Sequence, residues 1–178
     1  ARVMKMGDGG FRPAYNVQYA VAGSKLGGPR TIVGVNVTNL GSDMGSLSPM
    51  AEQIKQRTGE YPEVVLADAG HASHQDIQAM HEKRIAVLCA PAENAKSVEQ
   101  LRAENAPPGV VEWRERMETE EAKKAYRARA GLAELANAHQ KDHHGLSQVL
   151  VRGLTKVTSV VLLNVLASNI LSNARHLL

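Results

Sequence analysis

Residues 63–91 read EVVLADAGHASHQDIQAMHEKRIAVLCAP, and this stretch decides the fold. It holds two short apolar runs, 63–69 and 85–91, which lack the polar alternation of a half-exposed strand. Such runs are typical of strands that are covered on both faces. The residues between them, 73–83, follow a helical pattern with Ser73 as the N-cap. The order strand, helix, strand predicts a parallel pair with a right-handed crossover.

The preceding segment predicts an antiparallel hairpin and a helix. YNVQYAV (15–21) and TIVGVNVT (31–38) are rich in β-branched residues and alternate roughly, with a Gly-Gly-Pro loop between them. A helix is expected from the N-cap Ser48, with Pro49 in its first turn, to about Thr58, where Gly59 ends it. Together with the parallel strands, these elements predict an α/β fold with a mixed sheet and flanking helices.

The segment that follows is mostly helical by its pattern. Residues 92–109 give little signal, and the Pro-Pro-Gly at 107–109 predicts a break. One or two charged helices are expected from Val111 to about Gln140. Residues 154–178 predict a last apolar helix that packs on the sheet as core. Because Asn and Ser residues interrupt its apolar run, which stays well below the ~18 residues of a membrane span, no membrane partner is expected.

Composition and charge narrow the class of protein. A chain of 178 residues favours a single domain over 1–178, and one cysteine excludes an internal disulfide framework and suits a reducing compartment. The chain opens on Ala1 and a Gly-rich run, so an excised, N-terminally truncated domain is expected. Residues 1–30 carry five Lys/Arg against one Asp, and residues 139–178 carry four against one. These basic ends are compatible with a polyanionic partner, although from charge alone ordinary surface charge is the better explanation.

Asp68 is the first candidate functional residue. It follows the apolar run VVLA, so its side chain is expected at the carboxyl edge of a strand, where open α/β sheets bind ligands. The plainer interpretation is an Asp that hydrogen-bonds its own turn. Asp43, in the loop after an earlier strand, is explained well by a turn or capping role.

The segment YRARAGLAELANAHQK (126–141) supplies the second candidate carboxylate, Glu134. Arg127 and Lys141 each lie seven residues from it and share its helix face. Carboxylates on separate elements with cations around them suit a divalent metal held against phosphate. By spacing alone, a solvated helix with ion pairs explains the segment better.

The histidines and the cysteine offer a rival metal site. His71 and His74 form an H-x2-H pair, His143 and His144 are adjacent, and Cys89 ends a strand. A zinc-dependent hydrolase would need three or four such ligands in tetrahedral reach. No CxxC or HExxH spacing supports that alternative.

Several blocks, taken in order, resemble one family. GGFRPAYNVQYAV, VTNLGSDMGSLSPM, VVLADAGHAS, YRARAGLAELANAHQK and GLSQVLVRGLTKV are similar to the C-terminal part of insertion-sequence DDE transposases, within the group that has a Tyr-Arg-Glu-Lys signature. The resemblance covers nearly the whole chain. It implies a ribonuclease H-like fold and an enzyme of DNA transposition. In that family three acidic residues bind two Mg²⁺ ions, for which Mn²⁺ substitutes, to cut and join DNA strands.

The resemblance also implies roles for particular residues. Asp68 matches the second catalytic, metal-binding Asp and Glu134 the catalytic, metal-binding Glu. The expected DNA contacts are Tyr126, Arg127, Arg129, Lys141 and Arg152, where Arg127 is an alternative to Arg129 because the gap between Arg129 and Glu134 is four residues instead of three. His71 stands where the family commonly has Tyr. The expected partners are transposon-end and target DNA and a second copy of the chain, in a bacterial cytoplasmic, nucleoid-associated protein.

The first catalytic Asp has no good candidate in the chain. Nothing before Tyr15 reads as the strand that should carry it, and Asp8 lies in a GDGG loop, so it is expected upstream of Ala1. The alternative to an active transposase domain is therefore a catalytically inactive DNA-binding remnant that lacks this carboxylate.

Overall fold

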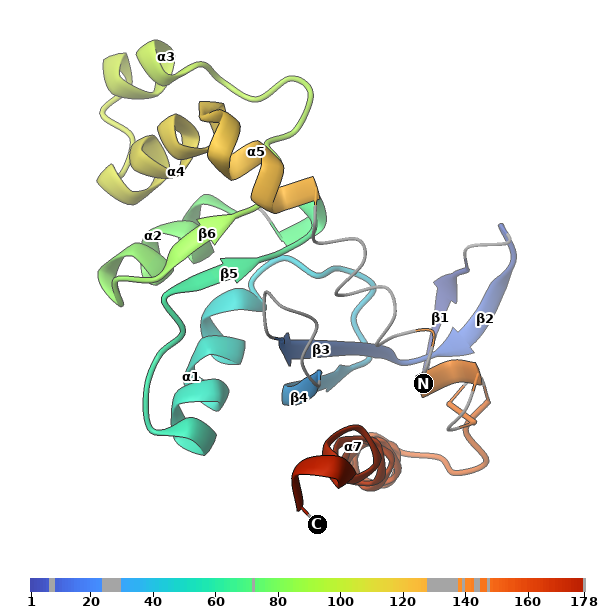
Figure 1. Cartoon of the computed structure of the whole chain (residues 1–178). Helices are drawn as coiled ribbons and strands as arrows, with labels where there is room; N and C mark the ends of the chain where they lie inside the picture. Colours follow the sequence, from blue (N-terminus) through green and yellow to red (C-terminus); the bar gives the residue numbers. More distant parts are fainter. Residues whose placement is uncertain are drawn as a thin grey trace. The chain divides into compact units, whose positions relative to one another are not determined.

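The computed structural model describes residues 1–6, 9–23, 30–71, 73–127, 138, 140–142, 145–146 and 148–177, with side chains as far as Ala174. The chain divides into two compact units. One unit comprises Ser42–Arg129, and the other comprises Ala1–Gly41 with Ala130–Leu178. Figure 1 shows the elements in sequence colours.

The unit Ser42–Arg129 is built on a parallel pair of strands. β5 (Val64–Leu66) pairs with β6 (Ala86–Leu88), and α2 (His74–Glu82) connects them along the chain, as the sequence predicts. The Ser73 side chain accepts a hydrogen bond from the Asp76 N–H, which confirms the predicted N-cap. β6 is covered, with Val87 1% exposed, whereas Val64 of β5 is 47% exposed. The prediction of full coverage therefore holds for β6 and is wrong for the start of β5.

α1 (Leu47–Thr58) begins earlier than predicted. Its N-cap is Ser46 and not Ser48, and the Ser46 side chain makes no capping bond. The buried Asp76 carboxylate caps the helix instead, since it accepts hydrogen bonds from the Leu47 and Ser48 N–H groups at 3.0 and 3.2 Å. An acceptor from α2 thus fixes the start of α1. Gly59 ends the helix with a φ of +91°, as predicted.

Three helices complete this unit. α3 (Val98–Ala103) begins with a capping box of Ser97 and Gln100, in a region for which the sequence predicts no element. α4 (Pro108–Glu118) starts at the Pro-Pro-Gly that was predicted to be a break, because proline fits the first helical turn. α5 is Glu120–Arg127. Trp113 of α4 is 3% exposed in a core cluster with Met80, Val87 and Cys89.

The other unit contains two antiparallel hairpins. β3 (Asn16–Ala22) pairs with β4 (Thr31–Thr38), which confirms the predicted hairpin and adds a bulge at Ala20/Val21. β1 (Arg2–Lys5) pairs with β2 (Phe11–Ala14), so the segment before Tyr15 forms two strands that the sequence reading did not anticipate. Both are short and largely exposed, and therefore carry little hydrophobic pattern. Asp8 lies outside the described residues.

α7 (Leu154–Leu177) packs on the β3–β4 hairpin as predicted. Val157 and Val161 are completely buried against Ile32 and Val35. A second set of apolar side chains on α7 is 40–67% exposed, namely Leu154, Leu162, Leu163, Leu166, Ile170 and Leu171.

The sequence-based prediction that the last helix cannot span a membrane was too strict. Residues Leu154–Ala174 have a mean hydropathy of 1.6, and this stretch is long and apolar enough to cross a membrane. Its Asn and Ser residues do not offset the many Val and Leu residues. Length and composition are weak evidence, however, because a core helix passes the same test and this helix buries its valine face on the hairpin.

Asn169 explains how α7 tolerates a polar residue on the packed side. Its Oδ1 accepts from the Ile32 N–H and its Nδ2 donates to the Ile32 carbonyl, both at 2.8 Å. The side chain therefore pairs with the β4 backbone as a neighbouring strand would.

We expect Asn169→Leu to destabilise the protein by about 1–3 kcal/mol although it adds apolar surface, because it leaves two backbone groups of Ile32 unpaired. Urea unfolding measures the effect. Ser172→Leu, at an exposed position of the same helix, is the matched control and should change the free energy of unfolding by less than about 0.5 kcal/mol. Equal stability of the two variants would contradict the pairing.

Within the described residues the strands form three two-stranded sheets, β1–β2, β3–β4 and β5–β6. The fold is thus α/β with small antiparallel and parallel sheets and helices, which is compatible with a ribonuclease H-like fold. The union of the β3–β4 hairpin and the parallel pair in one mixed sheet, and the single domain over 1–178, stay predictions.

Candidate functional site

Asp68 lies where the sequence places it, just beyond the carboxyl end of β5. Pairing with β6 continues for one residue, since the Ala67 N–H donates to the Leu88 carbonyl at 3.0 Å. The chain then enters a short 3-10 turn, Ala69–His71. Asp68 is exposed, and its Oδ1 accepts a hydrogen bond from the Ala69 N–H at 2.8 Å. This bond orients the carboxylate at the edge of the sheet.

The backbone of Asp68 is fixed from both sides. Its carbonyl accepts from the His71 N–H at 2.9 Å and from the Cys89 thiol at 2.9 Å. Cys89 is fully buried, and its own carbonyl accepts from the Trp113 indole N–H at 3.1 Å. The ends of β5 and β6 are therefore joined to each other and to α4.

A second acidic residue, Asp43, lies beside the turn that follows Asp68. A Cβ added at Gly70 would be 3.9 Å from the Asp43 Oδ2. The Ser46 hydroxyl donates to the Asp43 carbonyl at 2.6 Å and lies 2.7 Å from the His71 Nδ1. Sequence reasoning assigned Asp43 a local turn or capping role and missed this proximity. Its place in a loop after a strand was the only signal.

The rival zinc ligands have other surroundings. His74 contacts Trp113 edge-on, with ring centroids 6.5 Å apart. The Cys89 thiol donates a hydrogen bond to the Asp68 carbonyl. His143 and His144 lie outside the described residues. No three His, Cys, Asp or Glu side chains in the described part of the chain lie close enough to hold a metal ion.

The same finding applies to the predicted magnesium site. The donor chemistry of Asp68 fits a hard divalent cation, which prefers carboxylate oxygens. The described residues do not complete a ligand set around it, however. Glu134, the second predicted ligand, lies outside the described residues, and so does Arg129.

The other predicted DNA contacts fall in both units. Tyr126 is half-buried and packs against the core cluster of the Ser42–Arg129 unit, so only part of it is accessible. Arg127 is exposed at the end of α5. The pKa of Glu120 is lowered mainly by the hydrogen bond from Lys123 and, to a smaller extent, by the positive charge of Arg127. Lys141 and Arg152 are exposed and belong to the other unit.

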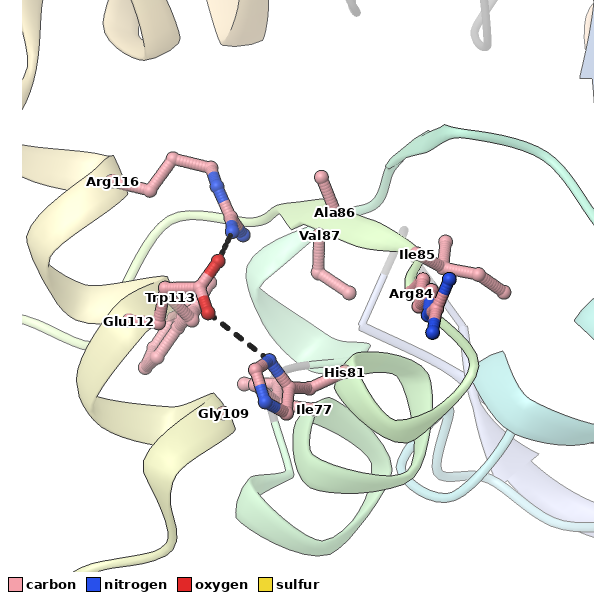
Figure 2. A pocket seen from close by; sticks show the side chains of 10 residues that line it. All are labelled: Ile77, His81, Arg84, Ile85, Ala86, Val87, Gly109, Glu112, Trp113 and Arg116. Carbon is pink, nitrogen blue, oxygen red and sulfur yellow. Dashed lines mark hydrogen bonds and ion pairs between the residues drawn. The ribbon is translucent and has the colours of Figure 1, made fainter.

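A cavity of about 300 Å³ lies at the opposite end of the parallel strands, between α2, α4 and the start of β6 (Figure 2). Glu112 bridges two of its lining side chains, with 3.1 Å to the His81 Nδ1 and an ion pair to Arg116. Arg84 lines the rim in a left-handed conformation with a φ of +60°. Because Asp68 follows the carboxyl end of β5, this cavity is separate from the candidate site.

The chain is similar to one known family over nearly half its length. Residues 88–172 match the family model described as "Transposase DDE domain". No curated protein and no solved structure gives a significant match. The match supports a DDE transposase family, a nuclease-type enzyme class and DNA as the partner. It spans the predicted late-helix residues from Tyr126 to Arg152, whereas Asp68 precedes it.

Proposed function

We propose that this chain is a catalytic segment of a transposase with the Tyr-Arg-Glu-Lys signature, which hydrolyses and joins phosphodiester bonds at transposon ends. The observation that carries the proposal is Asp68, an oriented and accessible carboxylate at the strand edge where α/β sheets bind ligands. The match over residues 88–172 supports the same chemistry for the segment that contains Glu134.

In this proposal Asp68 and Glu134 hold Mg²⁺, for which Mn²⁺ substitutes. The bound cation would stabilise negative charge on the phosphate that is attacked. Asp68 contributes a carboxylate whose direction is set by the Ala69 N–H before any ligand arrives. A carboxylate that needs no reorientation loses little entropy when it binds.

Basic side chains of both units would bind the DNA backbone. Arg127, Lys141 and Arg152 are exposed, and Arg129 completes the predicted set with the accessible part of Tyr126. Arginine and lysine bind the phosphate backbone without reading sequence, and each contact makes affinity fall with salt. The active form would be a homodimer that holds two transposon ends, at the bacterial nucleoid.

We expect the full-length protein to cleave labelled DNA that carries the flanks of its own gene, with Mg²⁺ or Mn²⁺ but not with EDTA. Glu134→Gln should reduce the cleavage rate by about 10²-fold or more, because one metal-binding charge is lost. Gel analysis of the cleaved strand measures it. An exposed carboxylate of α5, changed as Glu121→Gln, is the matched control and should leave the rate unchanged.

Two results would contradict the proposal. DNA binding without metal-dependent cleavage would identify an inactive remnant. Full activity of Glu134→Gln would show that the Glu134 carboxylate is not needed for catalysis.

A further inference from the structure

The contact between Ser46 and His71 determines which ring nitrogen of His71 carries the proton. The Ser46 hydroxyl has a single hydrogen, and it is donated to the Asp43 carbonyl at 2.6 Å. The contact of 2.7 Å with His71 is satisfied at the same time only when the serine oxygen accepts in it. The His71 Nδ1 is then the donor in this contact.

This bond connects the turn after Asp68 to a segment 25 residues earlier in the chain. The His71 N–H holds the Asp68 carbonyl, while the His71 ring holds Ser46 and, through it, Asp43. His71 thus ties the backbone of one acidic residue to the backbone of another. Without the ring contact, the Asp68 turn would keep its bonds to Cys89 and Ala69 but lose its bond to Ser46.

We propose that His71 and Ser46 form a positioning pair that holds the Asp68 carboxylate in place for its divalent cation, an inference that rests on the proposed function. Ser46 is suited to this role because its side chain makes no capping bond to α1, although it occupies the N-cap position. Its hydroxyl is engaged in the link between the two loops. Partners that orient metal-binding groups typically change metal affinity or activity by about 10–100-fold when they are removed.

Two amide substitutions distinguish a donor at the Nδ1 position from one at the Nε2 position. Asn places an N–H donor near the position of Nδ1, whereas Gln places its amide near Nε2. We expect His71→Asn to bind Mn²⁺ within about threefold of the wild type, and His71→Gln and His71→Phe to bind it about 10–100-fold more weakly. Isothermal titration of Mn²⁺ into the full-length protein measures affinity, and the Mn²⁺ concentration that half-saturates DNA cleavage gives a second readout.

Ser46→Ala should match the loss in His71→Phe, and the double variant should lose no more than either single variant, because both remove one bond. A thermal unfolding midpoint close to the wild type shows that folding is intact. Should His71→Phe fail to fold, the comparison of His71→Asn with His71→Gln carries the test, since both are polar and similar in size.

The proposal is overturned if His71→Asn binds Mn²⁺ as weakly as His71→Gln, or if all His71 variants bind it as the wild type does. Asp68→Asn in the same titration distinguishes the two levels of the argument. If Asp68→Asn loses Mn²⁺ and His71→Phe does not, only the positioning role fails. If neither change affects binding, the proposed function itself fails.

Discussion

Asp68→Asn is expected to reduce the DNA cleavage rate of the full-length protein by about 10²–10³-fold or more, because it removes the negative charge that binds the cation. The protein should fold normally. Asp68 is exposed, and an Asn Oδ1 can still accept the hydrogen bond from the Ala69 N–H. A single-turnover cleavage assay at saturating DNA isolates the chemical step from binding.

Glu60→Gln is the matched control for Asp68→Asn. Glu60 is an exposed carboxylate of the same unit and lies beyond the end of α1, so the change removes the same charge elsewhere. We expect it to keep the wild-type rate. A cleavage rate of Asp68→Asn within a few-fold of the rate of Glu60→Gln would show that Asp68 takes no part in the reaction.

The largest expected loss of stability follows Asp76→Ala. Asp76 is 5% exposed, and both of its carboxylate oxygens accept N–H groups at the start of α1. Its removal leaves these two donors without their acceptor and takes a negative charge from the positive end of a helix. We expect the free energy of unfolding to fall by about 2–4 kcal/mol, measured by urea denaturation.

The free energy of unfolding of Asp76→Asn should lie between those of the wild type and Asp76→Ala. The amide keeps one acceptor oxygen but turns an N–H group toward a donor. Gln75→Ala changes an exposed neighbour on the same helix and serves as the control. A loss below about 0.5 kcal/mol for Asp76→Ala, the size expected of a surface change, would show that water satisfies these donors.

Much of the fold is encoded locally and could be predicted. The parallel strands, the β3–β4 hairpin, the Ser73 cap and the apolar α7 each follow from a pattern within a single segment. The start of α1 could not be predicted, because its acceptor, Asp76, lies almost 30 residues away. β1 and β2 are too exposed to show a hydrophobic pattern.

The candidate site likewise has one part that the sequence predicts and another that depends on tertiary packing. The end of an apolar run placed Asp68 correctly at a strand edge. The contacts of His71 with Ser46, and of Asp43 with the Asp68 turn, depend on tertiary packing. No spacing rule connects residues on separate loops, so only the structure reveals them.

The central claim is that the Asp68 and Glu134 carboxylates hold a common set of divalent cations. A crystal structure of the full-length protein with Mn²⁺ tests it most directly, because anomalous scattering locates the metal. The account predicts Mn²⁺ within about 2.5 Å of an oxygen of Asp68 and a metal-to-metal distance of about 3.5–4 Å to the ion held by Glu134. Carboxyl groups separated by much more than about 10 Å, a span that two bridged ions cannot cover, would contradict it.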